Sequence, residues 1–147
     1  MTRAMFVTVF GRLANVNVSE YVTSSFKDVK TGFWYNEYVE WAAANGIILG
    51  FGNGDFKPDM IINHEQMYLI IKRYADFIGK GDYNKSITLT YNDKSLISDW
   101  AFDAVCYSKE CELVDVKTFG KLDPKGPAKR SEVAMLLYAF SRNVIYK

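Results

Sequence analysis

The chain has 147 residues, of which 49% are hydrophobic and 24% are charged, and its formal net charge is +1. This composition is typical of one globular domain and differs from that of disordered chains. The near-zero net charge gives no electrostatic reason to bind nucleic acid, and the apolar runs are too short to cross a bilayer. We therefore expect no nucleic-acid partner and no membrane insertion.

The first predicted element is a helix from Thr2 to Leu13, in which Phe6, Val9, Phe10 and Leu13 recur at helical spacing. A secretory signal would need a longer apolar core and a small-residue cleavage site, and neither is visible here. Either the chain is not exported, or it belongs to a longer exported chain whose start is missing.

A helix-loop-helix unit is predicted over residues 26–75. A short aromatic helix from Trp34 to Asn45 comes first, and Gly46 directly after it suits a left-handed helix end. A glycine-rich loop follows, in which the glycines and Pro58 favour a fixed turn. The long amphipathic helix begins at about Asn63, and its apolar stripe consists of Met67, Ile70, Ile71 and Tyr74.

The C-terminal half repeats this pattern after a polar connector over residues 79–95. A short strand is predicted within the connector at Ile87–Tyr91. The next short helix opens at Asp99 and Trp100, and its loop ends in G-K-L-D-P. The last helix carries an apolar stripe of Val133, Leu136, Leu137 and Phe140.

The helix-loop-helix unit recurs along the chain. Shifting the central unit by 66 positions aligns Trp34 with Trp100 and Pro58 with Pro124 without a gap, and shifting its long helix back by 61 positions aligns it with the first helix. The long helix thus occurs three times, and the short helix with its loop occurs twice. Because one such unit cannot bury its own stripe, we expect an all-α fold with three core helices and peripheral helix-loop prongs.

The main functional signal lies at the starts of the long helices, which read T-R-A-M, N-H-E-Q and K-R-S-E. Thr2 and Asn63 suit N-caps, and the second position holds Arg3, His64 or Arg130. A basic residue there opposes the helix dipole at a cost of about 0.3–1 kcal/mol. Beside the free N–H groups of a helix start it would suit a carboxylate or phosphate, with a tryptophan from a neighbouring prong to stack a sugar ring. The residues alone support a structural interpretation equally well, with solvated or salt-bridged arginines and tryptophans that only pack.

Other motifs lack parts of the sites they resemble. His64-Glu65 opens like H-E-x-x-H without the second histidine, and G-F-G-N-G lacks the Lys-Ser/Thr of a phosphate loop. The loop aspartates do not match a calcium loop. Cys106 and Cys111 make no metal site and are awkwardly spaced for a disulfide. We therefore expect no catalytic residues, no metal and no cofactor, and hence no enzyme.

The motifs F-K-D-V, W-Y-x-x-Y-V, A-A-x-N-G-I, G-F-G-N-G-D-F-K-P and the helix-start tetrads together resemble the S-layer homology family over nearly the whole chain. The resemblance implies one domain over residues 1–147: residues 1–18 close an incomplete first repeat, 26–79 form the second and 80–147 the third. It implies a pseudo-threefold bundle whose first prong is missing. It also implies anchoring of a surface protein to secondary cell-wall polysaccharide, often bearing a pyruvate ketal on an amino sugar, and a location at the cell surface.

The family's binding residues carry over position by position. Thr2 and Arg3 match the Thr-Arg of the family tetrad, although the fourth position has Met where the family usually has Glu. The resemblance implies that they face the prong of the second repeat, with Asp28, Trp34 and Gly46 as the wall. This groove keeps the expected charge.

The other two grooves depart further from the family pattern. Asn63 and His64 replace Thr-Arg, so a groove against Asp99 and Trp100 is expected to hold an anion weakly, and only when the histidine is protonated. Arg130 matches the third tetrad, but its expected partner, the first prong, is absent from this sequence. The third loop is expected to differ in shape, because the glycines of the second are replaced by Glu112, Val116 and Thr118.

Two function classes are compatible with these motifs. One is a carbohydrate-binding anchor module, and the other is a protein interaction or assembly module that has lost glycan binding on the same scaffold. The incomplete first repeat leaves one side of the bundle, around Phe6 and Phe10, expected to be uncovered. We hypothesise that the sequence is the C-terminal portion of a longer surface protein, the alternative being a self-association that covers the gap.

Overall fold

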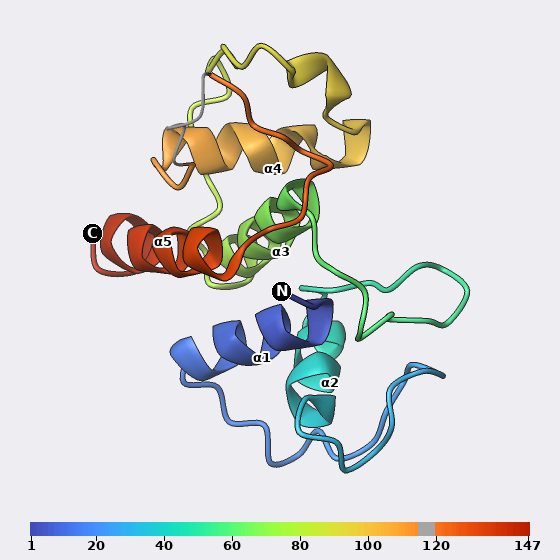
Figure 1. Ribbon diagram of the computed structural model, residues 1–147. Helices are drawn as coiled ribbons and strands as arrows, with labels where there is room; N and C mark the ends of the chain where they lie inside the picture. The colour runs from blue at the N-terminus through green and yellow to red at the C-terminus, as the bar shows by residue number, and fades with distance from the viewer. Residues whose placement is uncertain (115–119) are drawn as a thin grey trace. The chain divides into compact units, whose positions relative to one another are not determined.

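The computed structural model describes residues 1–114 and 120–147 (Figure 1). The described residues form five α-helices and two short helical turns, without a strand or sheet, which confirms the all-α prediction. None of these helices is long and apolar enough to cross a membrane. The chain divides into two compact units, here called unit 1 (Met1–Ile62) and unit 2 (Asn63–Lys147). The pseudo-threefold arrangement of the long helices stays a prediction.

Unit 1 contains α1 (Arg3–Leu13) and α2 (Asn36–Ala44). The predicted N-cap is confirmed, because Thr2 Oγ1 accepts a hydrogen bond from the N–H of Met5 at 3.3 Å. The two helices pack closely at Gly11, where a Cβ would lie 2.7 Å from Cδ1 of Tyr38. A residue without a side chain is therefore what lets the tyrosine ring lie against α1.

The loop after α2 is a fixed turn, as predicted. Gly46 has a φ of +69°, which confirms the left-handed end of α2, and the glycines at positions 50, 52 and 54 also have positive φ. The N–H of Phe51 donates to the carbonyl of Asp55 at 2.9 Å and closes the turn. From the other side, Lys27 Nζ donates to the carbonyl of Asn53 at 2.9 Å.

Unit 2 contains α3 (His64–Phe77), α4 (Asp99–Glu110) and α5 (Arg130–Phe140) (Figure 1). A 3-10 turn, Lys94–Leu96, precedes α4, and a π turn, Ser141–Ile145, follows α5. α3 packs against α4, and Tyr74 of α3 meets Phe140 of α5 with ring centres 6.0 Å apart.

The N-cap of α3 is also as predicted. Asn63 Oδ1 accepts from the N–H of Gln66 at 2.9 Å, and the Gln66 side chain accepts from the N–H of Asn63 at 3.4 Å. Together they form a capping box.

The strand predicted at Ile87–Tyr91 is wrong. The described residues offer this segment no partner strand, and two of its carbonyl groups accept hydrogen bonds from lysine side chains instead. Lys109 donates to the carbonyl of Thr88 at 2.7 Å, and Lys94 donates to that of Leu89 at 3.3 Å.

The apolar stripes predicted for the second and third long helices are confirmed, since every member is buried. The stripe predicted for α1 is confirmed for only two of its four members. Phe6 and Phe10 are fully buried, contrary to the expected uncovered side, whereas Val9 and Leu13 are 41% and 48% exposed. The contact with α2 through Gly11 turns the face of Ala4, Val7, Thr8 and Gly11 inward instead.

The same pair of backbone bonds joins a long helix to the loop of the following repeat in each unit. The N–H groups of Arg3 and Ala4 donate to the carbonyls of Met60 (2.9 Å) and Pro58 (3.0 Å). The positions shifted by 61 and 66 residues repeat this arrangement in unit 2, with bonds from His64 to Gly126 and from Glu65 to Pro124, both 3.1 Å. Each compact unit therefore begins with the long helix of one repeat and continues into the short helix and loop of the next. Its boundaries thus differ from those of the sequence repeat.

Candidate functional site

The first-turn N–H groups of α1 and α3 are already bonded within the protein. Loop carbonyls accept from the first two N–H groups of each helix, and the caps Thr2 and Asn63 accept from the third. The expectation that a ligand anion binds free N–H groups at these helix starts is therefore wrong. An anion at either position has to be held by side chains.

Arg3 is the best-oriented cation of unit 1. The residue is only 6% exposed, and its Nε donates to the carbonyl of Phe56 at 3.0 Å. Its Cζ lies 4.8 Å from the ring centres of both Phe51 and Phe56. Within the described part of the chain no carboxylate lies at ion-pair distance from the guanidinium. One edge is thus fixed by the loop, and the charge has no acidic partner.

Burial changes the pKa of this cation. It lowers the pKa of Arg3 to about 10, and the negative charge of Asp28 opposes the change. The guanidinium is still charged at neutral pH. A desolvated charge interacts more strongly with an incoming anion than a solvated one does, because the local dielectric constant is lower.

Asp28 supports the loop that holds Arg3. Its two carboxylate oxygens accept from the N–H of Phe56 at 2.8 Å and from that of Lys57 at 2.7 Å. These bonds fix the peptide whose carbonyl receives the arginine Nε. Asp28 therefore acts on the arginine through the loop, and it does not pair with it directly.

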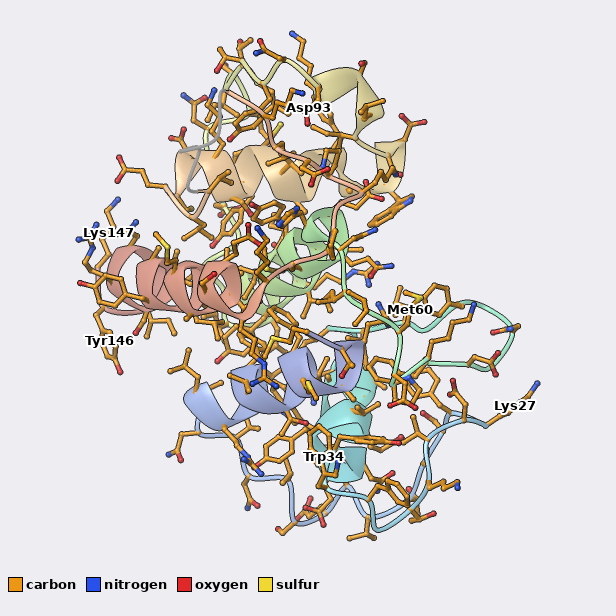
Figure 2. All side chains as sticks on the ribbon, viewed as in Figure 1. Lys27, Trp34, Met60, Asp93, Tyr146 and Lys147 are labelled. Atoms are coloured by element: carbon orange, nitrogen blue, oxygen red, sulfur yellow. The ribbon has the colours of Figure 1, made fainter. Side chains whose placement is uncertain are left out.

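Trp34 offers an exposed aromatic face near the start of α2 (Figure 2). It is 54% exposed and meets Tyr35 edge-on, with ring centres 5.0 Å apart. Burial, and then the charges of Asp59 and Asp28, raise the pKa of the Tyr35 phenol.

Gly46 is solvent-exposed, with open space where a side chain would be. No hydrogen bond, ion pair or ring contact among the described residues joins Trp34 or Gly46 directly to Arg3. Phe51 and Phe56, which do contact the arginine, were not predicted as site residues. The signal available for them was their place in the glycine-rich loop that leads to the next tetrad.

His64 takes the arginine's place in unit 2 and is already paired. Its Nδ1 lies 2.7 Å from the carbonyl oxygen of Asp123, and its Nε2 lies 3.1 Å from Oε2 of Glu132. Both partners are hydrogen-bond acceptors, so both ring nitrogens are engaged within the protein. Burial acts to raise the pKa of Glu132, but hydrogen bonds from the N–H of Lys129 and from the histidine outweigh it and lower the pKa.

Asp93 is the unit 2 counterpart of Asp28 (Figure 2). Its carboxylate accepts from the N–H groups of Leu122 and Asp123 at 2.9 and 2.8 Å. The sequence did not indicate this residue, because an ungapped shift of 66 places Lys94 opposite Asp28. Asp99 is exposed in the first turn of α4, and its role as a groove wall stays a prediction.

A second cluster surrounds Trp100, which is 51% exposed. Lys125 Nζ lies 5.9 Å from the tryptophan ring and 2.6 Å from Oε1 of Glu65. Glu65 is only 2% exposed and also accepts from the N–H of Ser98 at 3.1 Å. The charges of Lys125 and Glu65 are thus paired within unit 2.

A cavity of about 1050 Å³ lies in unit 2 beside His64. Its charged lining includes Lys121 and Lys129 but is mainly acidic, with Asp93, Glu112, Asp123 and Glu132. Glu112 has a φ of +55°, the left-handed conformation of its counterpart Gly46, so the expected change of loop shape is wrong at that position. Val116 and Thr118 lie outside the described residues.

Arg130 is exposed at the start of α5. The described residues place no carboxylate within ion-pair distance of it. Its ligand role stays a prediction.

Comparison with known proteins gives one family match, the S-layer homology domain, over residues 25–67. An amylopullulanase of Thermoanaerobacterium thermosulfurigenes is 33% identical over 138 residues, which are 94% of this chain and 7% of that protein. An exoglucanase of Acetivibrio thermocellus is 31% identical over 138 residues, 94% of this chain and 12% of that protein. An S-layer protein of Bacillus anthracis is 24% identical over 135 residues, 92% of this chain and 15% of that protein. The chain therefore spans only a small part of the length of these relatives.

Proposed function

We propose that the chain is a cell-surface anchoring module of the S-layer homology family and that it anchors its parent protein through unit 1. The proposed ligand is secondary cell-wall polysaccharide, bound through the carboxylate of a pyruvate ketal on an amino sugar. The observation that carries this proposal is Arg3, a buried and oriented cation without an acidic partner among the described residues.

The chemistry of unit 1 supports a carboxylate ligand. The Nε of Arg3 is occupied by the carbonyl of Phe56, so the terminal nitrogens of the guanidinium remain for a forked interaction with one carboxylate. The exposed face of Trp34 suits the apolar face of a sugar ring. Thr2, Asp28 and Gly46 are assigned supporting roles through the helix cap and the loop.

Unit 2 favours a different assignment. The carboxylate of Glu132 pairs with the ring of His64, and the carboxylate of Glu65 pairs with the ammonium of Lys125. We infer that the groove of Asn63, His64, Asp99 and Trp100 is a weak anion site or none. The alternative function, a protein interaction or assembly module, is thus supported for unit 2 only. The chain itself is proposed to have no enzymatic activity, since the relatives named as enzymes match it over a small part of their length.

The test is co-sedimentation of the protein with cell walls that carry pyruvylated polysaccharide, and with walls from which the ketal has been removed by mild acid. We expect binding to the first and not to the second. Arg3→Gln and Trp34→Ala should each weaken binding at least tenfold, since each removes a contact worth about 1.5–3 kcal/mol.

Arg12→Gln is the matched control, because Arg12 lies at the other end of α1 with its Cζ 5.6 Å from the Tyr38 ring. Circular dichroism checks that each variant is folded. Binding that survives both Arg3→Gln and Trp34→Ala, or that ignores removal of the ketal, rejects the proposal.

A further inference from the structure

We propose that Lys57 is a second cation for the carboxylate bound at Arg3 and that it sets the preference of unit 1 for an acidic glycan. This inference rests on the proposed function and adds a residue to it. Lys57 Nζ lies 4.5 Å from the centre of the Phe51 ring, and the Cζ of Arg3 lies 4.8 Å from the same centre. The two cations therefore share one aromatic ring, which is 40% exposed.

Among the described residues, neither charge has an acidic partner at ion-pair distance. Another lysine of this unit, Lys27, is used by the fold, since its Nζ donates to the carbonyl of Asn53 at 2.9 Å. Within the described residues the ammonium of Lys57 makes neither a hydrogen bond nor an ion pair. Two like charges beside one ring repel each other, and a carboxylate that contacts both removes this repulsion.

The backbone at Lys57 is a second observation. Its φ is +59°, in the left-handed region that asparagine, aspartate and glycine adopt more readily than lysine. Its N–H is held there by Asp28 at 2.7 Å. The equivalent residue of unit 2, Asp123, has a φ of +51° and is of the favoured type. Local conformation therefore gives no reason for a lysine at position 57.

The comparison with unit 2 indicates what the lysine does. At the two equivalent positions unit 2 has Asp123 for Lys57 and a histidine for Arg3, and that histidine is paired with Glu132. Glu112 adds a further acid to the same cavity. Unit 2 thus repels the carboxylate that unit 1 attracts, and we expect one carboxylate site in this chain.

The test is isothermal titration of the intact chain with a synthetic amino sugar that carries a pyruvate ketal, and with the same sugar lacking the ketal. Lys57→Asn removes the charge and introduces a residue that tolerates the backbone conformation. We expect its affinity for the ketal sugar to fall about five- to tenfold, as for a charge-assisted contact, and its affinity for the ketal-free sugar to stay unchanged. Lys57→Arg should stay within about twofold of the wild type because it keeps the charge.

Arg12→Gln again serves as the control for net charge and should bind like the wild type. If Lys57→Asn binds the ketal sugar as tightly as the wild type while Arg3→Gln does not, the role of Lys57 is rejected and the proposed function stands. If Arg3→Gln also binds normally, the proposed function fails. An equal loss in Arg12→Gln points to non-specific attraction and overturns the role of Lys57. Lys57→Asn should melt at or above the wild-type temperature, so a weaker affinity in a stable variant is a binding effect.

Discussion

The carboxylate of Asp93 offers a sharp test of how the loops are held. It accepts two backbone hydrogen bonds, from Leu122 at 2.9 Å and from Asp123 at 2.8 Å. Hydrogen bonds to charged groups contribute about 1.5–3 kcal/mol each, and partial exposure reduces that value. In Asp93→Asn the amide keeps one acceptor and turns an N–H₂ group toward the second N–H. We expect a loss of about 2 kcal/mol in the free energy of unfolding at pH 7.

The lowered pKa of Asp93 determines how this loss of stability depends on pH. Burial acts to raise the pKa of Asp93, but the N–H groups of Leu122 and Asp123 outweigh it, and the pKa lies below the ordinary 3.8. A carboxyl whose pKa is lowered by folding stabilises the native state above its unfolded pKa, and this contribution is lost as the pH falls through the folded pKa. The difference between wild type and Asp93→Asn should therefore be constant from pH 7 to 5 and shrink below about pH 4.

Urea unfolding followed by circular dichroism measures this difference, and amide hydrogen exchange at Leu122 and Asp123 measures the two bonds directly. Both amides should exchange faster in Asp93→Asn. Asp82→Asn is the control, since Asp82 is exposed. A variant that loses less than about 0.5 kcal/mol at pH 7, or a difference that persists unchanged at pH 2, would refute the reasoning.

Three further predictions concern a helix contact, a buried ion pair and a backbone conformation. Gly11→Ala should destabilise the protein by about 1–3 kcal/mol in urea unfolding, because the new Cβ meets the Tyr38 ring, and Tyr38→Ala in the same chain should recover part of the loss. Glu65→Gln should cost about 2–4 kcal/mol, because the buried carboxylate bonds to Lys125 and Ser98, and an unchanged unfolding midpoint would contradict it. Glu112→Gly should raise the unfolding midpoint, with a gain of about 0.5–1 kcal/mol, because Glu112 has a left-handed φ.

The two units show how one scaffold presents different charges at equivalent positions. The backbone joints at Arg3 and His64 are equivalent, and Asp28 and Asp93 make equivalent pairs of hydrogen bonds. The side chains presented on these joints differ in charge. Because the backbone joint and the aspartate hold the loop in both units, we expect that other charged residues around it can change without loss of the fold.

Local signals determined much of this protein from the sequence alone. The long helices, their caps at Thr2 and Asn63, and the left-handed end at Gly46 depend on residues a few positions apart, and these predictions are confirmed. The repeat was readable for the same reason, since both copies keep their spacing. The strand at Ile87–Tyr91 failed because β-propensity needs a pairing partner, which a sequence window does not contain.

The tertiary structure alone decided how the candidate site is built. It showed that loop carbonyls occupy the helix-start N–H groups, that Asp93 does in unit 2 what Asp28 does in unit 1, and that Glu132 pairs with a histidine 68 residues away. It also brought Arg3 and Lys57 to the same aromatic ring, that of Phe51. These contacts join residues far apart in the chain, so their energies depend on the fold as a whole and not on any local pattern.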